Sequence, residues 1–312
     1  MLSPNKTYPQ LTGLRSPLDP AQLTNRGEIK SFLRTALAWK GTVSPKVIPR
    51  VLLTALFSVM VVTLVEVYPA LTVPMTPFEY SGAFLGLLLV IRVNAGLDRW
   101  WEARKIWGSI VNQSRNLALA GYEYSEAKQG VGAHFLRWVA SWPHVMRESL
   151  RREKNLVEVS KLLGEEEAEK IRQSVHMPTY VGARIIQLIS ELRSKGLDSF
   201  AFMQVERERA LLIDAIGACE RIRNTPIPFV LAVKTRRFIL LFLLLLPFGL
   251  TAKAEWFTPM IVALVAYPLF SLDEIGAELQ NPFSPRNLSH LPLNDICNTI
   301  ESNVMSLESS KT

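Results

Sequence analysis

A few charged residues, within and directly after an apolar run, are the ones whose type and spacing favour electrostatic chemistry in this chain. Arg92 interrupts the apolar run 80–97, and Asp98, Arg99 and Glu102 follow that run without an intervening turn residue. An arginine near a membrane segment is costly and is often functional. It can also extend its charged end to the membrane interface or pair with a nearby carboxylate. Both interpretations of Arg92 stay open, with Asp98 or Glu102 as the expected partners.

Residues suited to catalysis or metal binding form no comparable set. The four histidines lie outside the apolar segments and share no pairing interval, which disfavours a haem or metal site. The two cysteines, Cys219 and Cys297, are far apart, so the sequence indicates neither a disulfide framework nor a thiolate metal site. We therefore expect no enzyme activity, no cofactor and no bound metal.

Composition places the chain between soluble and fully membrane-embedded proteins. It has 312 residues, 48% of them hydrophobic, and a formal net charge of +7. Basic residues crowd into the first fifty positions and thin out between the apolar segments, a distribution typical of the positive-inside rule. The sequence offers no basic face with interleaved aromatic residues, so we expect no nucleic-acid partner.

Four apolar segments are the elements that must position the charged residues. They cover residues 51–65, 80–97, 238–252 and 256–272. Each uninterrupted run is shorter than the roughly 20 residues that span a bilayer, so each is also compatible with a buried core helix. The links within each pair are short and nearly free of positive charge, which favours spanning with both termini and the middle region in the cytoplasm.

The remaining sequence predicts an all-α protein in which transmembrane helices continue into a helical cytoplasmic domain. Apolar residues recur at three- and four-residue spacing in the middle region, and strand-like alternation does not persist. The helix of the second segment is expected to continue into water through Glu102, and the prolines of NTPIPFV (224–230) are expected to interrupt the helix before the third segment. The predicted organisation is a cytoplasmic N-terminal segment 1–46, transmembrane helices 1 and 2 at 47–98, a cytoplasmic helical domain 99–228, transmembrane helices 3 and 4 at 229–274, and a cytoplasmic tail 275–312.

Three separated motifs resemble the bestrophin family, in its bacterial branch. They are RVNAGLDRWWEARKIWGSIVNQSRN (92–116), CERIRNTPIP (219–228), and NPF followed by LPLNDICNTIE (281–301). Their order matches the expected membrane topology, and the similarity covers most of the chain. The resemblance implies a homopentameric ion channel with four transmembrane helices per subunit and one pore on the fivefold axis.

The resemblance also implies where the pore is narrow. Its apolar neck falls on Ala83, Leu87 and Ile91, which share one helical face because they are spaced by four. Rings of such side chains are wetted poorly and gate ions by dewetting. The alternative is that these three residues are ordinary helix-packing residues. Family necks often carry aromatic residues, and this one has none. A second, cytoplasmic aperture falls on Ile227, whose alternative is a loop isoleucine packed on its neighbours.

The resemblance also implies roles for the charged residues within and directly after the second apolar segment. Arg92 becomes a vestibule charge below the neck, where five copies would attract anions. Asp98, Arg99 and Glu102 become structural ion pairs that hold the neck helix to its cytosolic extension. Animal family members bind Ca²⁺ through an acidic run after NPF, but here Asp295 is the only carboxylate of that stretch, so no metal is expected.

The expected function is conduction of chloride and other monovalent anions. The expected partners are other copies of the chain, membrane lipids and the permeant ions, and the expected location is a bacterial inner (plasma) membrane that the chain crosses several times. A monovalent cation channel of the same fold stays open, because acidic residues could line an entrance equally well. A membrane-anchored scaffold or receptor is the alternative from another class.

Overall fold

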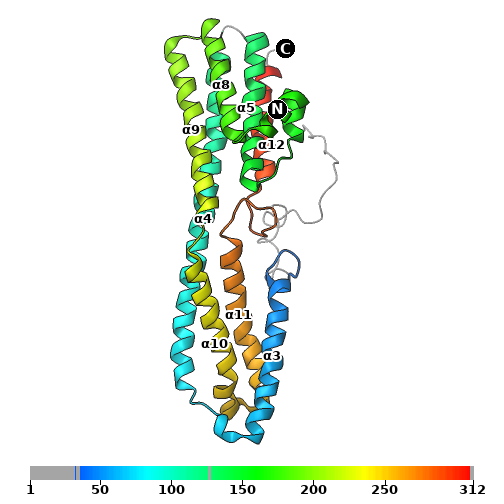
Figure 1. Cartoon of the computed structure of the whole chain (residues 1–312), viewed down its shortest axis with the longest axis vertical. Coiled ribbons are helices and arrows are strands. Elements are labelled where there is room, and N and C mark those ends of the chain that lie inside the picture. The colour runs from blue at the N-terminus through cyan, green and yellow to red at the C-terminus, as the bar shows by residue number, and fades with distance from the viewer. Residues whose placement is uncertain (1–31, 33–35, 126–127, 310–312) are drawn as a thin grey trace, which may run out of the picture. The chain divides into compact units, whose positions relative to one another are not determined.

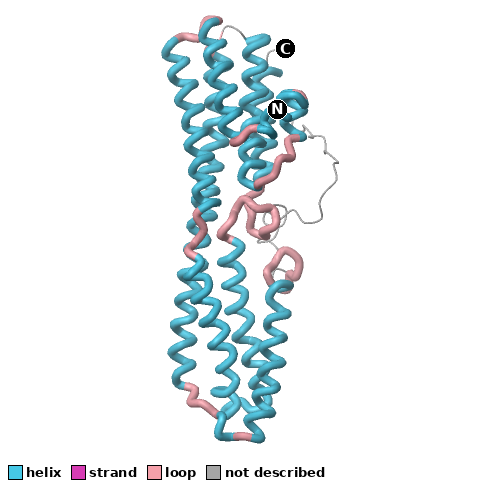
Figure 2. Tube along the Cα trace, viewed as in Figure 1, coloured by secondary structure: helices cyan, strands magenta, loops and turns pink. Residues whose placement is uncertain are grey.

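The computed structural model describes residues 32, 36–125 and 128–309, and within them every regular element is a helix (Figure 2). The chain divides after Thr42 into a short unit, residues 1–42, and a large unit, residues 43–312. Most of the predicted N-terminal segment 1–46 lies outside the described residues. The prediction of an all-α protein is confirmed for the described part of the chain.

Four helices of the large unit contain the four apolar segments. In chain order they are α3 (Ser44–Val67), α4 (Thr76–Glu123), α10 (Phe229–Ala254) and α11 (Thr258–Glu278), with short 3₁₀ turns η1 (Pro69–Leu71) and η3 (Glu255–Phe257) in the links. Helix α3 packs on α10 and α11, and the first part of α4 packs on the same two helices (Figure 1). We call this group the apolar bundle. By length and composition, α3 and α4 are able to cross a membrane.

Apolar side chains both fill the apolar bundle and cover its outside. Leu85 and Leu89 of α4 are fully buried in a core shared with α3, α10 and α11. On the outside, Leu56, Leu240 and Leu264 are more than half exposed. Exposing large apolar side chains to water costs about 25 cal/mol per Å², so this outer surface suits a hydrocarbon environment better than water.

Helix α4 links the apolar bundle to the rest of the large unit. It runs for 48 residues without a break, because its sequence contains no proline after the first turn and no turn motif. Its first part packs on α10 and α11, and its later part packs on helices of a second bundle. The predicted continuation of the second apolar segment through Asp98 and Glu102 as one helix is confirmed.

The second bundle consists of the helices that follow α4 and precede α10, together with the C-terminal helix. They are α5 (Ala133–Arg151), α6 (Val157–Leu163), α7 (Glu165–Gln173), α8 (Met177–Ser194), α9 (Ser199–Asn224) and α12 (Leu293–Ser309), with a π-helical turn η2 (Lys128–Gly132) before α5. Its core is built around large side chains such as Trp107, Trp138 and Phe283, all fully buried. Helix α12 returns to pack on α5 and α4.

The chain interrupts its helical path between the second bundle and the apolar bundle. Helix α9 ends at Asn224 and α10 begins at Phe229, so residues 225–228 connect them. Pro226 and Pro228 have no backbone N–H to donate, which prevents a continuous helix here. The predicted interruption is confirmed, and it leaves Ile227 in a short irregular segment.

Candidate functional site

Helix α4 has two faces with different surroundings at the level of the apolar bundle. Leu85 and Leu89 are fully buried, whereas Leu87 is 57% exposed and Ile91 is 49% exposed. Ala83 is exposed as well. Because successive residues of an α-helix are about 100° apart, residues spaced by four share a face. Ala83, Leu87 and Ile91 therefore form one apolar strip, which the rest of the described chain leaves largely uncovered.

Arg92 lies on the opposite, buried side of α4. Its side chain is 3% exposed, and its Nη2 lies 3.0 Å from Oδ1 of Asp273 on α11. Asp273 also accepts a hydrogen bond of 2.9 Å from Nε of Arg236 on α10. The partner of Arg92 is therefore Asp273, in place of the expected Asp98 or Glu102.

This placement favours the second interpretation of Arg92, a pair with a carboxylate, over a vestibule charge. Within the single chain the Arg92 side chain is almost fully covered. The physical reason is helical geometry, because Arg92 is rotated by about 100° from its exposed neighbour Ile91. A carboxylate partner offsets part of the cost of burying a guanidinium, and α11 supplies one.

Arg99 anchors three segments by donating to backbone carbonyl groups. Its Nη1 donates to the carbonyl oxygen of Thr225 at 2.7 Å, and its Nη2 donates to that of Ile222. Its Nε and Nη2 donate to the carbonyl oxygen of Gln280 at 3.3 and 3.2 Å. The last carbonyl groups of a helix lack helical partners, and the negative end of the helix dipole attracts a cation. Arg99 thus caps the C-terminus of α9 rather than pairing with a carboxylate.

Within the described part of the chain, only one of the three expected ion-pair residues lies in an ion pair. The carboxylate of Glu102 accepts a hydrogen bond from Nη2 of Arg221 on α9 at 3.2 Å, which joins α4 to α9. Both side chains are substantially exposed, so this pair contributes less than about 1 kcal/mol. Asp98 is exposed and has no ion pair within the described residues.

Ile227 lies between the two prolines that separate α9 from α10, and its side chain is half-buried. The segment that carries it is held at one end by the Arg99 bonds to Ile222 and Thr225. The hydroxyl of Thr225 also donates to the carbonyl oxygen of Arg221 at 2.6 Å. Ile227 is therefore placed by the same arginine that extends from α4, seven residues beyond Arg92.

A buried polar cluster joins α5 to α12 in the second bundle. His144 is fully buried, and its Nε2 lies 2.7 Å from a carboxylate oxygen of Glu301. Its Nδ1 lies 3.4 Å from Nη1 of Arg147, which also pairs with Glu148 at 2.9 Å. A neutral histidine that donates from Nε2 and accepts at Nδ1 fits both contacts. Burial, and then the charge of Arg147, lower the pKa of His144.

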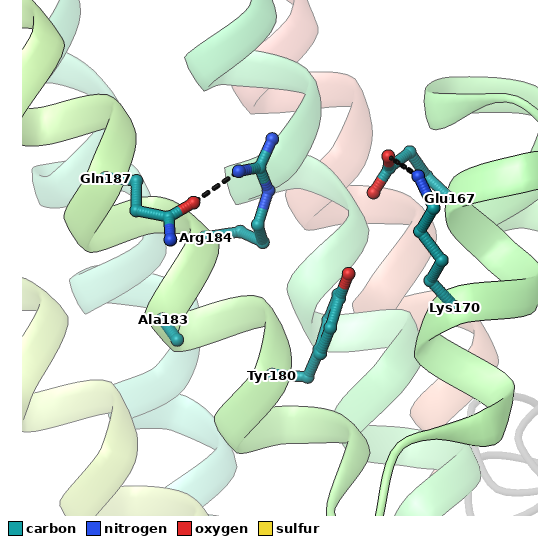
Figure 3. A pocket seen from close by; sticks show the side chains of 6 residues that line it. All are labelled: Glu167, Lys170, Tyr180, Ala183, Arg184 and Gln187. Carbon is teal, nitrogen blue, oxygen red and sulfur yellow. Dashed lines mark hydrogen bonds and ion pairs between the residues drawn. The ribbon is translucent and has the colours of Figure 1, made fainter.

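A surface pocket lies on α7 and α8 of the second bundle (Figure 3). Tyr180 and Arg184 of α8 line it together with Glu167 and Lys170 of α7. Lys170 pairs with Glu167 at 2.9 Å, and Arg184 donates to Gln187 and stacks on the ring of Trp138. Glu167 balances the charge of Lys170, whereas Arg184 has no carboxylate partner among the described residues.

Asp273 and Arg236 are the site residues that the sequence interpretation missed. Asp273 directly follows the fourth apolar segment and precedes Glu274, and a carboxylate at the end of an apolar run is the only sequence signal that marks it. Arg236 belongs to a basic group before the third segment, which the sequence connects with topology and with attraction of anions, but not with Arg92. Neither residue lies near Arg92 in the sequence.

Comparisons with known proteins agree on one family. A family model described as Bacterial/Fungal Bestrophin protein matches residues 24–306. The chain is 32% identical over 285 residues to the voltage-dependent anion channel-forming protein alr2987 of Nostoc sp., with 90% of this chain and 92% of the relative covered. It is 30% identical over 279 residues to the voltage-dependent anion channel-forming protein YneE of Escherichia coli, with 88% and 91% covered.

A solved structure has the same fold. The crystal structure of a bacterial bestrophin homolog from Klebsiella pneumoniae aligns with a TM-score of 0.78 and 27% sequence identity. The alignment covers 85% of this chain and 99% of that chain. The similarity therefore includes both bundles and the long helix that links them.

Proposed function

The chain belongs to the bacterial and fungal bestrophin family, and from this premise we propose that it forms a membrane channel that conducts chloride and other monovalent anions. The Nostoc and Escherichia coli relatives are named as anion channel-forming proteins. The observation that carries the proposal is the uncovered apolar strip of α4, formed by Ala83, Leu87 and Ile91. The strip lies on the helix that passes from the apolar bundle to the second bundle, where a conducting path through a membrane would run.

Five copies of the chain surround one pore in this proposal. A single strip on one helix cannot enclose an ion path, so several copies must place their strips around a common axis, and closed cyclic symmetry is the usual arrangement. The number five follows from the resemblance to the family. Mass determination of the purified protein in detergent tests it, and a monomer or dimer as the main species would contradict it.

The neck gates by its apolar character in this assembly. Leu87 and Ile91 from each copy would form two adjacent rings that carry no charge, and water enters such a constriction reluctantly. Their exposure within one chain supports the proposal, because a side chain that lines a pore cannot be buried inside its own subunit. Such a neck has no preference for the sign of an ion, so selectivity must come from charges elsewhere.

Ile227 forms the second constriction, at the cytoplasmic end of the path. Two prolines fix the backbone beside it, and Arg99 holds the preceding carbonyl groups. A rigid backbone with an apolar side chain would select ions by size and by how easily they lose water.

Positive charge near this aperture supports the preference for anions. Lys234, Arg236 and Arg237 are exposed on the first turns of α10, directly after the Ile227 segment. The N-terminus of α10 adds partial positive charge from its free N–H groups. Together these charges would raise the local anion concentration. Arg92 contributes nothing here, because it is buried.

A monovalent cation channel is the second candidate, favoured by the position of Asp98. Asp98 follows Ile91 by seven residues, which places it on the same face of α4 as the neck strip. Its carboxylate is exposed and has no ion pair within the described residues. A ring of such carboxylates beside the neck would attract cations.

The proposed topology has all four helices of the apolar bundle across a bacterial inner membrane, in contact with lipid. The second bundle and both termini lie in the cytoplasm. Basic residues at the second-bundle ends of α3 and α10, such as Lys46, Arg50 and Lys234, support this orientation through the positive-inside rule.

The deciding experiment is current measurement in planar bilayers with a KCl gradient. A reversal potential close to that of chloride supports the first proposal, and one close to that of potassium favours the second. Asp98→Asn is the informative variant, because it should strengthen anion preference in the first case and abolish cation preference in the second. Absence of current from correctly assembled protein would contradict both proposals and favour a scaffold or receptor.

A further inference from the structure

Three charged side chains from three helices meet inside the large unit. Asp273 of α11 is 5% exposed and lies between Arg92 of α4 and Arg236 of α10. Arg92 is 3% exposed, whereas Arg236 is 54% exposed. One carboxylate therefore serves two guanidinium groups, of which only one is accessible to water.

The two contacts of Asp273 differ in kind. Nε of Arg236 donates a hydrogen bond of 2.9 Å to Oδ2. Oδ1 lies 3.0 Å from Nη2 of Arg92 but accepts no hydrogen bond from any described residue, and Nε of Arg92 is likewise buried without a partner. Buried polar groups are normally hydrogen-bonded, so an exception calls for an explanation. Arg92 and Asp273 therefore attract each other mainly by their charges. Their contact lacks the hydrogen bond that such buried groups normally form.

Helices α4 and α11 approach closely around this contact. A Cβ atom added to Gly96 would lie 3.0 Å from Cβ of Leu279, and one added to Gly276 would lie 3.2 Å from Cγ of Arg92. The absence of a side chain at Gly276 leaves room for the stem of Arg92, and the absence of one at Gly96 leaves room for Leu279. A displacement of α4 along or around α11 therefore acts directly on the Arg92 contact.

The contact lies beside the proposed neck. Ile91 and Arg92 are adjacent residues of α4. The side chain of Ile91 lies on the exposed strip, whereas that of Arg92 contacts Asp273 of α11. We propose that Arg92 and Asp273 are positioning residues for the neck, and that Asp273 holds α4 through Arg92 in one gating state and bonds only Arg236 in the other. This inference rests on the proposed channel function, which it deepens.

Competition between the two arginines gives the inference a definite sign. Arg92→Met removes the contact that holds α4 but keeps the hydrogen bond between Asp273 and Arg236, so the buried carboxylate keeps one cationic partner. Arg236→Gln removes the competing charge, so Asp273 interacts with Arg92 alone and the contact between α11 and α4 becomes stronger. The two variants should therefore move the ratio of open to closed time in opposite directions, each by about tenfold, a size typical of coupled contacting residues.

A double-mutant cycle tests the pair in single-channel recordings. We expect Arg92→Met combined with Asp273→Asn to shift the ratio by less than the product of the two single shifts, because each change removes the same contact. The matched control is Glu274→Gln, which alters the next carboxylate of α11. Glu274 pairs with Lys46 at 3.6 Å and Arg50 at 3.2 Å on α3, not with α4. The shift of the open-to-closed ratio in the double variant of Glu274→Gln and Arg92→Met should equal the product of the two single shifts.

The outcomes separate the inference from the proposed function. Opposite shifts with a coupled cycle support it. Shifts in the same direction, or a cycle as independent as the Glu274 control, would assign the pair to folding alone and overturn it. If Arg92→Met does not assemble, Arg92→Lys replaces it in the test, because lysine keeps the charge. An open-to-closed ratio equal to that of the parent in both Arg92→Lys and Arg236→Gln would also overturn the inference. A parent channel without current contradicts the proposed function itself, whatever the variants do.

Discussion

Replacing Arg99 with methionine should release the segment that carries Ile227. Methionine keeps an apolar stem of similar shape but loses every donor, so the carbonyl groups of Ile222, Thr225 and Gln280 lose their shared partner. The carbonyl of Thr225 lies in exposed surroundings and can turn to water, whereas the bonds to Ile222 and Gln280 are part-buried. The main loss therefore comes from two acceptors.

The expected magnitude follows from those two acceptors. Leaving a buried acceptor without a donor costs roughly 1–2 kcal/mol, so the pair costs roughly 2–4 kcal/mol. Since 1.4 kcal/mol corresponds to a factor of ten, local opening at the end of α9 should become more frequent by about 30-fold to several hundredfold. This cost is local, because the cores of the two bundles do not include Arg99.

Hydrogen exchange measured by mass spectrometry tests this estimate of local opening. The amide of Thr225, which donates to Arg221 at 3.0 Å, and its neighbours should lose protection in Arg99→Met. The control is Arg221→Met, which breaks only the exposed pair with Glu102 and should cost less than about 1 kcal/mol. Equal protection in the parent and in Arg99→Met would refute the capping role.

Three further predictions concern the neck, the aperture and pH. Leu87→Ala and Ile91→Ala should raise conductance or open probability while changing stability by less than about 1 kcal/mol, because both side chains are half exposed; parent-like currents in both would contradict the neck assignment. Ile227→Ala should change permeability ratios among anions of different size more than total current, and unchanged ratios would return Ile227 to a packing role. The third rests on the lowered pKa of His144 in the folded chain. When the pH falls below the ordinary histidine value of 6.5, the unfolded chain binds a proton at this residue more readily than the folded chain, so thermal stability should decrease as the pH decreases. His144→Gln should weaken that dependence, and an unchanged pH profile would exclude His144 as its cause.

Local features of the fold could be predicted from the sequence. The continuous α4 follows from the absence of any turn residue between the apolar run and Glu102, and the end of α9 follows from the two prolines around Ile227. The shared face of Leu87 and Ile91 needs only the helical repeat. Each of these inferences uses signals that lie within a few residues of one another.

The partners of the charged residues could not be predicted in the same way. Asp273 lies 181 positions after Arg92 in the chain, and only the packing of α11 on α4 brings them together. The acceptors of Arg99 are backbone carbonyl groups, which have no sequence signature at all. Sequence proximity therefore suggested Asp98 or Glu102 as the partner of Arg92, whereas its partner in the structure is Asp273.

The ion pair that the sequence could not predict also explains why the apolar strip of Ala83, Leu87 and Ile91 faces outward. If α4 were rotated by one residue about its axis, Arg92 would leave Asp273 and one of the apolar residues would take its place against α11. Removing one partner from a buried pair costs about 3–5 kcal/mol, more than the burial of one isoleucine would return. The orientation of α4 is thus specified by a charge on its hidden face. A buried ion pair often adds little net stability, but it selects one arrangement among several that apolar packing alone would tolerate. In this chain the arrangement it selects is the one in which Leu87 and Ile91 are free to line a pore.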